Sequence, residues 1–160
     1  MYYISMLDPD ALDRKIAEMG DEYSGKKDRI KDIEKRIKAL EEQINDIDVY
    51  RKTKPIVDGV PKHFGIDRYM REHESEFILY AAAERSLKKN FGDGKLPLIK
   101  ELRAEQKELR VEKDKLKGQI NDEKPPLDEL KTMRKNIDLF MGVDDRAEQR
   151  RTKKRSGELE

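Results

Sequence analysis

The residues most suited to ligand binding lie near the C-terminus, where positive charge is concentrated. Six cations fall within one short stretch: Arg146, Arg150, Arg151, Lys153, Lys154 and Arg155. Cations at this density neutralise backbone phosphates and bind nucleic acid without sequence preference, and the affinity falls steeply as salt rises. No aromatic residue is interleaved, so base stacking is not expected. These residues are candidate DNA contacts, and a tail that only adds solubility is the alternative.

Metal and thiol chemistry have few residues available in this chain. Cysteine is absent, which excludes a disulfide framework, a thiolate metal site and a cysteine nucleophile. The two histidines, His63 and His73, do not have the four-residue spacing of the helical zinc motif. We expect His63 in a loop and His73 partly buried on a helix, with no metal site and no cofactor.

Carboxylates are abundant, but a catalytic acid or base needs a partly dry pocket that shifts its pKa. The pairs Glu41-Glu42 and Asp144-Asp145 fall in solvated segments, so we interpret them as surface charges. The run from Gly92 to Lys95 lacks the full spacing of a phosphate-binding loop and is better explained as a helix terminus. The sequence therefore predicts no catalytic residue and a chain that is not an enzyme by itself.

The composition of the 160-residue chain favours helices that pack along narrow seams. Charged residues make up 44% of the chain and hydrophobic residues only 35%, so a large globular core is not expected. Disorder is the rival interpretation, but 36 basic and 35 acidic residues nearly cancel and the apolar residues recur at helical spacing. The longest apolar run, Phe77 to Ala83, is too short to span a bilayer. We expect a cytoplasmic protein with no membrane partner.

The first helix carries the strongest pattern and is expected to begin at Asp8, Pro9 and Asp10, with Asp8 as the cap. Its apolar positions alternate in steps of four and three, which is the a/d pattern of a coiled coil, if Lys26 is counted as one polar interruption. These positions are Leu12, Ile16, Met19, Tyr23, Ile30, Ile33, Ile37, Leu40, Ile44 and Ile47. Pro55 is predicted to end the helix, and Lys54 to Pro61 to form an irregular connection.

Two further helices are predicted. A shorter middle helix is expected from about Asp67 to Asn90 and is closed by Gly92. A third helix opens near Pro97 and has a thinner seam, because its alternate positions Gln106 and Lys113 are polar. The pair Pro125-Pro126 is expected to kink or interrupt this helix. An apolar face then resumes through Leu127, Leu130, Met133, Ile137, Phe140 and Met141 up to Gly142.

The predicted fold is all-α. It is a long antiparallel helical hairpin or coiled coil with a shorter middle helix, comprising residues 8–142, followed by a disordered basic tail at 143–160. A parallel homodimer through the first helix is the competing arrangement, and the sequence does not decide between them.

Parts of the chain resemble the helical, non-catalytic C-terminal region of relaxases, the nucleases that mobilise conjugative and mobilisable elements. The resemblance rests on Arg71 to Ala83, an aromatic-rich helix with an acidic stretch and an alanine run, and on Lys95 to Leu102, a leucine-proline start to a charged helix. The ending from Asn136 to Asp144 also resembles that region. The Pro125-Pro126 interruption and the connection from Lys54 to Pro61 depart from the family pattern.

The resemblance implies an accessory region that binds DNA or other transfer proteins of the relaxosome during plasmid or transposon mobilisation. Relaxases nick DNA with a tyrosine beside a histidine-bound metal, and no matching histidine cluster is present. The nicking residues are therefore not assigned, and neither Tyr2 nor Tyr3 is taken as a nucleophile. The alternative function is a structural coiled coil that oligomerises or holds partners.

Overall fold

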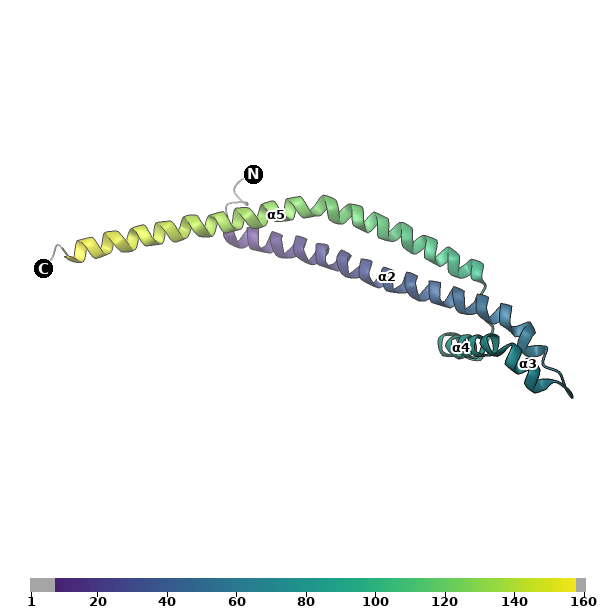
Figure 1. Cartoon of the computed structure of the whole chain (residues 1–160). Coiled ribbons are helices and arrows are strands. Elements are labelled where there is room, and N and C mark those ends of the chain that lie inside the picture. Colours follow the sequence, from purple (N-terminus) through teal and green to yellow (C-terminus); the bar gives the residue numbers. More distant parts are fainter. Residues whose placement is uncertain (1–7, 158–160) are drawn as a thin grey trace. The chain divides into compact units, whose positions relative to one another are not determined.

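The computed structural model describes residues 8–157, which form helices and short connections without a strand. The helices are α2 (Pro9–Asp58), α3 (Ile66–Glu72), α4 (Glu74–Phe91) and α5 (Ile99–Gly157), shown in Figure 1. The all-α prediction with two long helices and shorter middle elements is confirmed. The chain divides into two compact units: unit 1 combines Met1–Ile30 with Lys115–Glu160, and unit 2 is Lys31–Asp114.

The start of α2 follows the predicted cap. The Asp8 side chain accepts a hydrogen bond from the backbone N–H of Asp10 at 3.1 Å, and the Asp8 carbonyl accepts one from Leu12 at 3.0 Å. Pro9 occupies the first helical position, where its missing N–H costs nothing. The predicted a/d positions of α2 are all buried or half-buried, and so is Lys26. Ile33, Leu40 and Ile47 are the most deeply buried large side chains of the described chain.

Within each unit α2 and α5 run antiparallel, as the order of their ion pairs shows. In unit 1, Asp13 pairs with Arg134, and Lys26, further along α2, pairs with Glu123, which comes earlier in α5. In unit 2, Glu34 pairs with Lys113, and Arg36 pairs with Glu105. Partners move in opposite directions along the two helices in both units, so each unit contains a stretch of hairpin (Figure 1).

The polar residues in the α5 seam have specific partners on α2. The Gln106 side chain is buried and donates a hydrogen bond to the Ile37 carbonyl at 3.2 Å, and Lys113 pairs with Glu34. Lys26 in α2 is likewise matched, by Glu123. The α5 seam, which has few apolar residues, is therefore completed by polar contacts. Opposite charges or a hydrogen-bond partner lie where two apolar residues would otherwise meet.

The core of unit 2 draws on three helices. Leu40 and Ile47 of α2, Leu87 of α4 and Leu102 of α5 form one buried cluster. Around this cluster α4 is also held to α2 by polar and aromatic contacts. Ser86 donates a hydrogen bond to the Asp46 carboxylate at 2.6 Å, and the rings of Tyr50 and Tyr80 stack with their centroids 5.1 Å apart.

The C-terminus of α2 lies beyond the predicted one. Pro55 is inside the helix, which continues to Asp58, so the prediction that Pro55 ends it was wrong. The Tyr69 hydroxyl donates a hydrogen bond to the Ile56 carbonyl at 2.6 Å, which satisfies one of the acceptors left at the helix end. A Cβ at Gly59 would lie 2.9 Å from that hydroxyl, so glycine leaves room for the contact. The hydrogen bond from Tyr69 to Ile56 thus stabilises the last turn of α2, which contains Pro55.

The predicted middle helix is split at His73, where α3 ends and α4 begins. The backbone of His73 has φ −116° and ψ 25°, outside the helical region, although its N–H still bonds the Tyr69 carbonyl. The predicted closure at Gly92 is confirmed, because Gly92 has a positive φ of 69° and follows Phe91, the last residue of α4.

Helix α5 is continuous through Pro125 and Pro126, contrary to the expected interruption. A proline cannot donate to the carbonyl four residues earlier, which here belongs to Asn121 and Asp122. Both of these residues are exposed, as are both prolines, so water can reach the carbonyls that lose a donor. Before the two prolines Glu123 pairs with Lys26, and after them Leu127 is buried in the seam. These contacts hold the helix together across the two prolines.

Residues 143–157 also belong to α5, whereas the sequence favoured disorder from Val143 onward. The described side chains from Arg146 to Gly157 are exposed, so no tertiary contact stabilises this stretch. Alanine, glutamate, glutamine, arginine and lysine predominate here, and these residues have high helix propensity. The high helix propensity of these residues accounts for a helix where low hydrophobicity alone favoured disorder.

Candidate nucleic-acid interface

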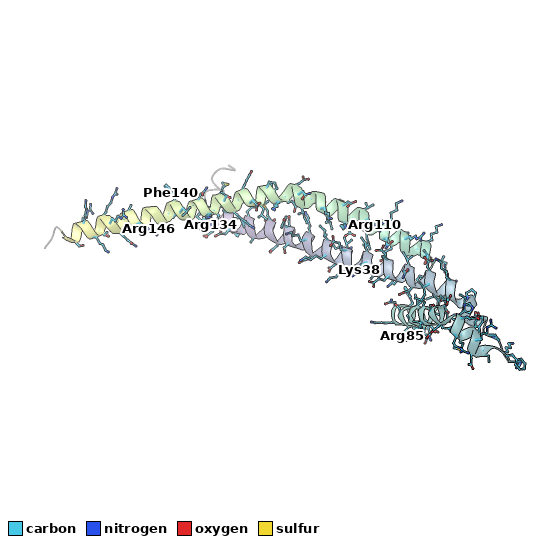
Figure 2. All side chains as sticks on the ribbon, in the orientation of Figure 1. Lys38, Arg85, Arg110, Arg134, Phe140 and Arg146 are labelled. Carbon is cyan, nitrogen blue, oxygen red and sulfur yellow. The ribbon has the colours of Figure 1, made fainter. Side chains whose placement is uncertain are left out.

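The six predicted cations lie on the last turns of α5. At about 100° of rotation per residue, Arg146, Arg150, Lys153 and Lys154 fall within roughly one quarter to one third of the helix circumference, and Arg151 and Arg155 extend this cationic face to one side. In Figure 2, Arg146 lies on the stretch of α5 beyond Arg134 and Phe140, past the start of α2. Four of the six cations that the sequence indicated as a cluster are thus brought together on one face, and Arg151 and Arg155 lie to one side of it.

The opposite side of the same turns is polar without net positive charge. Thr152 donates a hydrogen bond to the Glu148 carbonyl at 3.1 Å, and Ser156 donates one to the Lys153 carbonyl at 3.0 Å. These hydroxyls are satisfied by the helix backbone and support its last turns. The helix therefore has a cationic face and an opposite polar face that includes Glu148, a division that simple counting of charges does not reveal.

The cations of this face lack partners among the residues that the structure describes. None of the six forms an ion pair there, whereas Arg36 and Arg134 each pair with a carboxylate on the other long helix. The hydrogen bond to Glu105 raises the pKa of Arg36 above its ordinary value, and the one to Asp13 does the same for the pKa of Arg134. Cations already paired have less to gain from a phosphate, so the unpaired face is the better candidate for anion binding.

The two histidines lie in different local environments. His63 is exposed in the bend before α3, as predicted. His73 is partly buried at the α3–α4 junction, where its ring contacts that of Tyr69 and its Nδ1 lies 3.9 Å from the Glu76 carboxylate. The Nδ1 atom has no hydrogen-bond partner in the described structure. Within residues 8–157, no three histidine or carboxylate side chains gather as a metal site.

Gly92, Asp93 and Gly94 line a small cavity of unit 2, and the charges of its lining do not suit a phosphate. Lys88 is the one basic residue in the described lining, and it already pairs with Glu84 at 3.3 Å. Asp93 adds a further negative charge to the wall. The interpretation of this segment as a helix terminus agrees with the positive φ of Gly92. The predicted surface pair Glu41 and Glu42 is exposed, and the side chains of Asp144 and Asp145 lie outside the described residues.

Sequence reasoning missed the partners of the polar seam residues. Lys26 was treated as a polar interruption and Gln106 as a polar position that thins the seam, yet each contacts a specific group on the facing helix. The available signal was the spacing in α5, where Gln106, Lys113, Glu123 and Arg134 continue the same alternation of three- and four-residue steps as its apolar residues. Polar residues in register with a seam indicate a partner rather than a gap.

None of the helices in residues 8–157 is both long and apolar enough to cross a membrane. Comparison with known proteins gave no match, whether to a family model, a curated protein or a solved structure.

Proposed function

We propose that this chain is a non-catalytic accessory region of a relaxase that binds DNA through the cationic face of α5 during mobilisation of a plasmid or conjugative transposon. The relaxase assignment is supported by the resemblance of Arg71 to Ala83 and of Lys95 to Leu102 to that family's helical region. The binding mode is supported by the cations of the α5 terminus, which form no ion pair within the part of the chain that the structure describes. Contact with other transfer proteins is part of the same proposal.

The observation that carries the proposal is the exposed row of Arg146, Arg150, Lys153 and Lys154, none of which has an ion-pair partner among the described residues. A rigid helix presents one face to a duplex, so these four cations are the ones that meet phosphates together. Because they act by charge, they bind DNA without reading bases. Binding to a phosphate backbone also stabilises an exposed helix that has no other tertiary partner.

Counterion release sets the size of the effect. Four phosphate contacts correspond to a slope of log Kobs against log salt of about −3.6 on duplex DNA and about −2.8 on a single strand. Raising salt from about 50 to about 200 mM then weakens duplex binding by roughly two orders of magnitude. Full engagement of all six cations would steepen the duplex slope to about −5.

Fluorescence anisotropy with labelled single- and double-stranded DNA at several salt concentrations tests this directly. The variant R146Q/R150Q/K153Q/K154Q is expected to lose most binding and to flatten the salt slope. A matched control, K35Q/K38Q/K52Q/K89Q, removes the same charge from exposed lysines of unit 2 and is expected to retain the slope. Absence of binding by the wild-type chain at low salt would remove the DNA contact from the proposal, and equal losses in both variants would assign binding to net charge alone.

The relaxase assignment has a separate test in gene context. A nuclease domain with a tyrosine nucleophile and a metal-binding histidine cluster, encoded next to this segment in the same mobile element, is the expected finding. Repeated occurrence of the chain away from any mobilisation gene would contradict it.

A structural module is the second candidate function, and the α2–α5 seam is the observation that favours it. Its simplest form, a parallel homodimer through α2, would have to open the hairpin, because the heptad positions of α2 are already covered within the chain. A variant with Ile37→Asp places a charge in this seam and is expected to unfold the hairpin rather than only dissociate a dimer.

A further inference from the structure

The connection between α2 and α3, residues 59–65, carries the most exposed large apolar side chain of the described chain. Phe64 in this tip loop is 90% exposed. Ile66 and Met70, which follow in α3, are 36% and 44% exposed, so three apolar side chains lie open within residues 64–70. Burial of a phenylalanine ring is strongly favourable, and the ring of Phe64 has most of its surface available to a partner.

The tip loop is closed at both ends by one residue. The backbone N–H of Tyr69 donates a hydrogen bond to the Gly65 carbonyl at 2.9 Å, and its hydroxyl donates one to the Ile56 carbonyl at 2.6 Å. Within the loop Pro61 has a fixed φ, and Gly65 takes the positive φ of 75° that turns the chain into α3. Figure 1 shows this loop at the end of unit 2, between α2 and α3. Phe64 is therefore presented on an ordered turn, which lowers the entropic cost of binding a partner.

Positive charge accompanies the exposed ring. The tip loop contains Lys62 and His63 and no carboxylate. Lys62 is exposed and forms no ion pair with any residue that the structure describes. Of the nearest carboxylates, Asp58 before the loop already pairs with Lys54 at 3.3 Å, and Asp67 follows the loop on α3. An aromatic ring beside such a cation is a combination that binds single-stranded nucleic acid, the ring for a base and the cation for a phosphate.

We infer that the tip loop binds single-stranded DNA by stacking Phe64 on an unpaired base while Lys62 contacts a neighbouring phosphate. This inference rests on the DNA binding proposed above, and it adds the base stacking that the cationic face of α5 lacks. In a duplex each base is already paired and stacked between its neighbours, so its face is not open to the ring without unstacking. Stacking uses the π face that every base has. The tip loop therefore selects single strands over duplexes without reading their sequence.

The surroundings of the ring favour a base over a lipid surface or a protein pocket. A membrane-surface helix needs a broad apolar face, but four of the seven residues of α3 are charged. An apolar anchor in a protein interface is surrounded by further contacts that exclude water, whereas the direct neighbours of Phe64 in the loop are His63 and Gly65. A small residue on one side of a flat ring leaves room for a base to stack.

Fluorescence anisotropy with an oligothymidylate and with a duplex of the same length tests the base contact. Phe64→Ala is expected to weaken binding of the single strand roughly 5- to 100-fold and to leave the salt slope unchanged, because the lost contact carries no charge. Duplex affinity should stay within about twofold. The matched control Phe64→Leu keeps an apolar side chain without a π face and is expected to lose as much affinity as Phe64→Ala. Lys62→Gln should instead flatten the single-strand slope by about 0.7.

The chain has no tryptophan, so Phe64→Trp introduces a single fluorophore at the tip loop. Its ring also stacks, so this variant should keep the wild-type affinity for the single strand, and its emission should be quenched when the strand binds. Leu79→Trp on α4, where the leucine is 50% exposed, is the matched control and is expected to show no quenching. Circular dichroism of each variant checks that the helix content is unchanged.

These measurements separate the tip loop from the α5 contact. Salt-dependent binding of the wild-type chain without quenching of Phe64→Trp would overturn the stacking and leave the α5 contact in place. Quenching that persists after the R146Q/R150Q/K153Q/K154Q substitutions, with the single-strand salt slope unchanged, would support the tip loop and overturn the α5 contact. Neither binding nor quenching at low salt would remove both.

Other partners of the tip loop give other results. Full affinity in Phe64→Leu, or an equal loss of duplex and single-strand binding in Phe64→Ala, would replace base stacking by a plain apolar contact or by a duplex contact. A blue shift of the Phe64→Trp emission on anionic lipid vesicles, without quenching by the oligothymidylate, would assign the loop to a membrane surface. Each of these results would refute the inference.

Discussion

Truncation of Leu40 to alanine tests whether the three-helix cluster is the stabilising core of unit 2. Leu40 is 0% exposed and packs with Ile47 of α2, Leu87 of α4 and Leu102 of α5. Its replacement removes buried methyl and methylene groups and leaves a cavity whose walls belong to three different helices. Collapse of that cavity requires one helix to move against two others, so only partial relaxation is expected.

Leucine-to-alanine changes at buried sites cost about 2 to 5 kcal/mol, of which the part beyond simple transfer grows with the volume of the remaining cavity. Complete burial and three-sided packing place Leu40 in the middle of that range, about 3 kcal/mol. The matched control is Leu79→Ala on α4, where the leucine is 50% exposed and an effect within about 0.5 kcal/mol is expected.

Urea unfolding followed by circular dichroism gives the free energy of unfolding of both variants and of the wild-type chain. A shift of the urea midpoint without a change in slope is the expected signature of lost packing. The reasoning is refuted if Leu40→Ala costs less than about 1 kcal/mol or no more than Leu79→Ala, since the cluster would then not be the core that stabilises unit 2.

Two further predictions concern tyrosine hydroxyls of unit 2. Tyr69→Phe removes the hydrogen bond to the Ile56 carbonyl at 2.6 Å and should cost about 1 kcal/mol of unfolding free energy, with Tyr23→Phe, whose hydroxyl has no described hydrogen-bond partner, as the near-neutral control. Equal effects of these two changes would show that the contact does not stabilise the end of α2. The hydroxyl interaction with Tyr50, assisted by burial, raises the pKa of Tyr80 to about 12. The stabilisation that accompanies the raised pKa of Tyr80 is therefore fully present below about pH 10, the ordinary tyrosine pKa, and is lost as pH rises toward 12. Ultraviolet titration of tyrosinate should show one late-titrating group that moves earlier in Tyr50→Phe, and an unchanged profile in that variant would contradict the assignment.

Much of the fold was predictable because the determining interactions are local or periodic. The Asp8 cap, the a/d positions of α2 and the closure of α4 at Gly92 each depend on a few neighbouring residues or on a repeated spacing. The candidate site was predictable to the same extent, since six clustered cations are visible in the chain itself. The arrangement of four of them on one face required the additional fact that α5 continues to Gly157.

The remaining features could not be predicted because their energies come from residues distant in the chain. Whether Pro55 ends α2 depends on Tyr69, whose hydroxyl bonds the Ile56 carbonyl. Whether Lys26 interrupts the seam depends on Glu123, almost one hundred residues later. Local sequence contains neither contact, so it predicted a helix end at Pro55 and a polar interruption of the seam at Lys26.

The sequence by itself therefore determined the helical class, the heptad seam of α2 and the position of the cationic segment, because periodic burial and charge clustering are properties of the chain order. Tertiary structure decided the intramolecular antiparallel pairing within each unit, the partners of Gln106 and Lys113, and the exposure of Phe140 beyond the start of α2. A heptad pattern indicates that the apolar face of a helix is buried against a partner. Only the register of that partner helix decides how far along the face the burial extends.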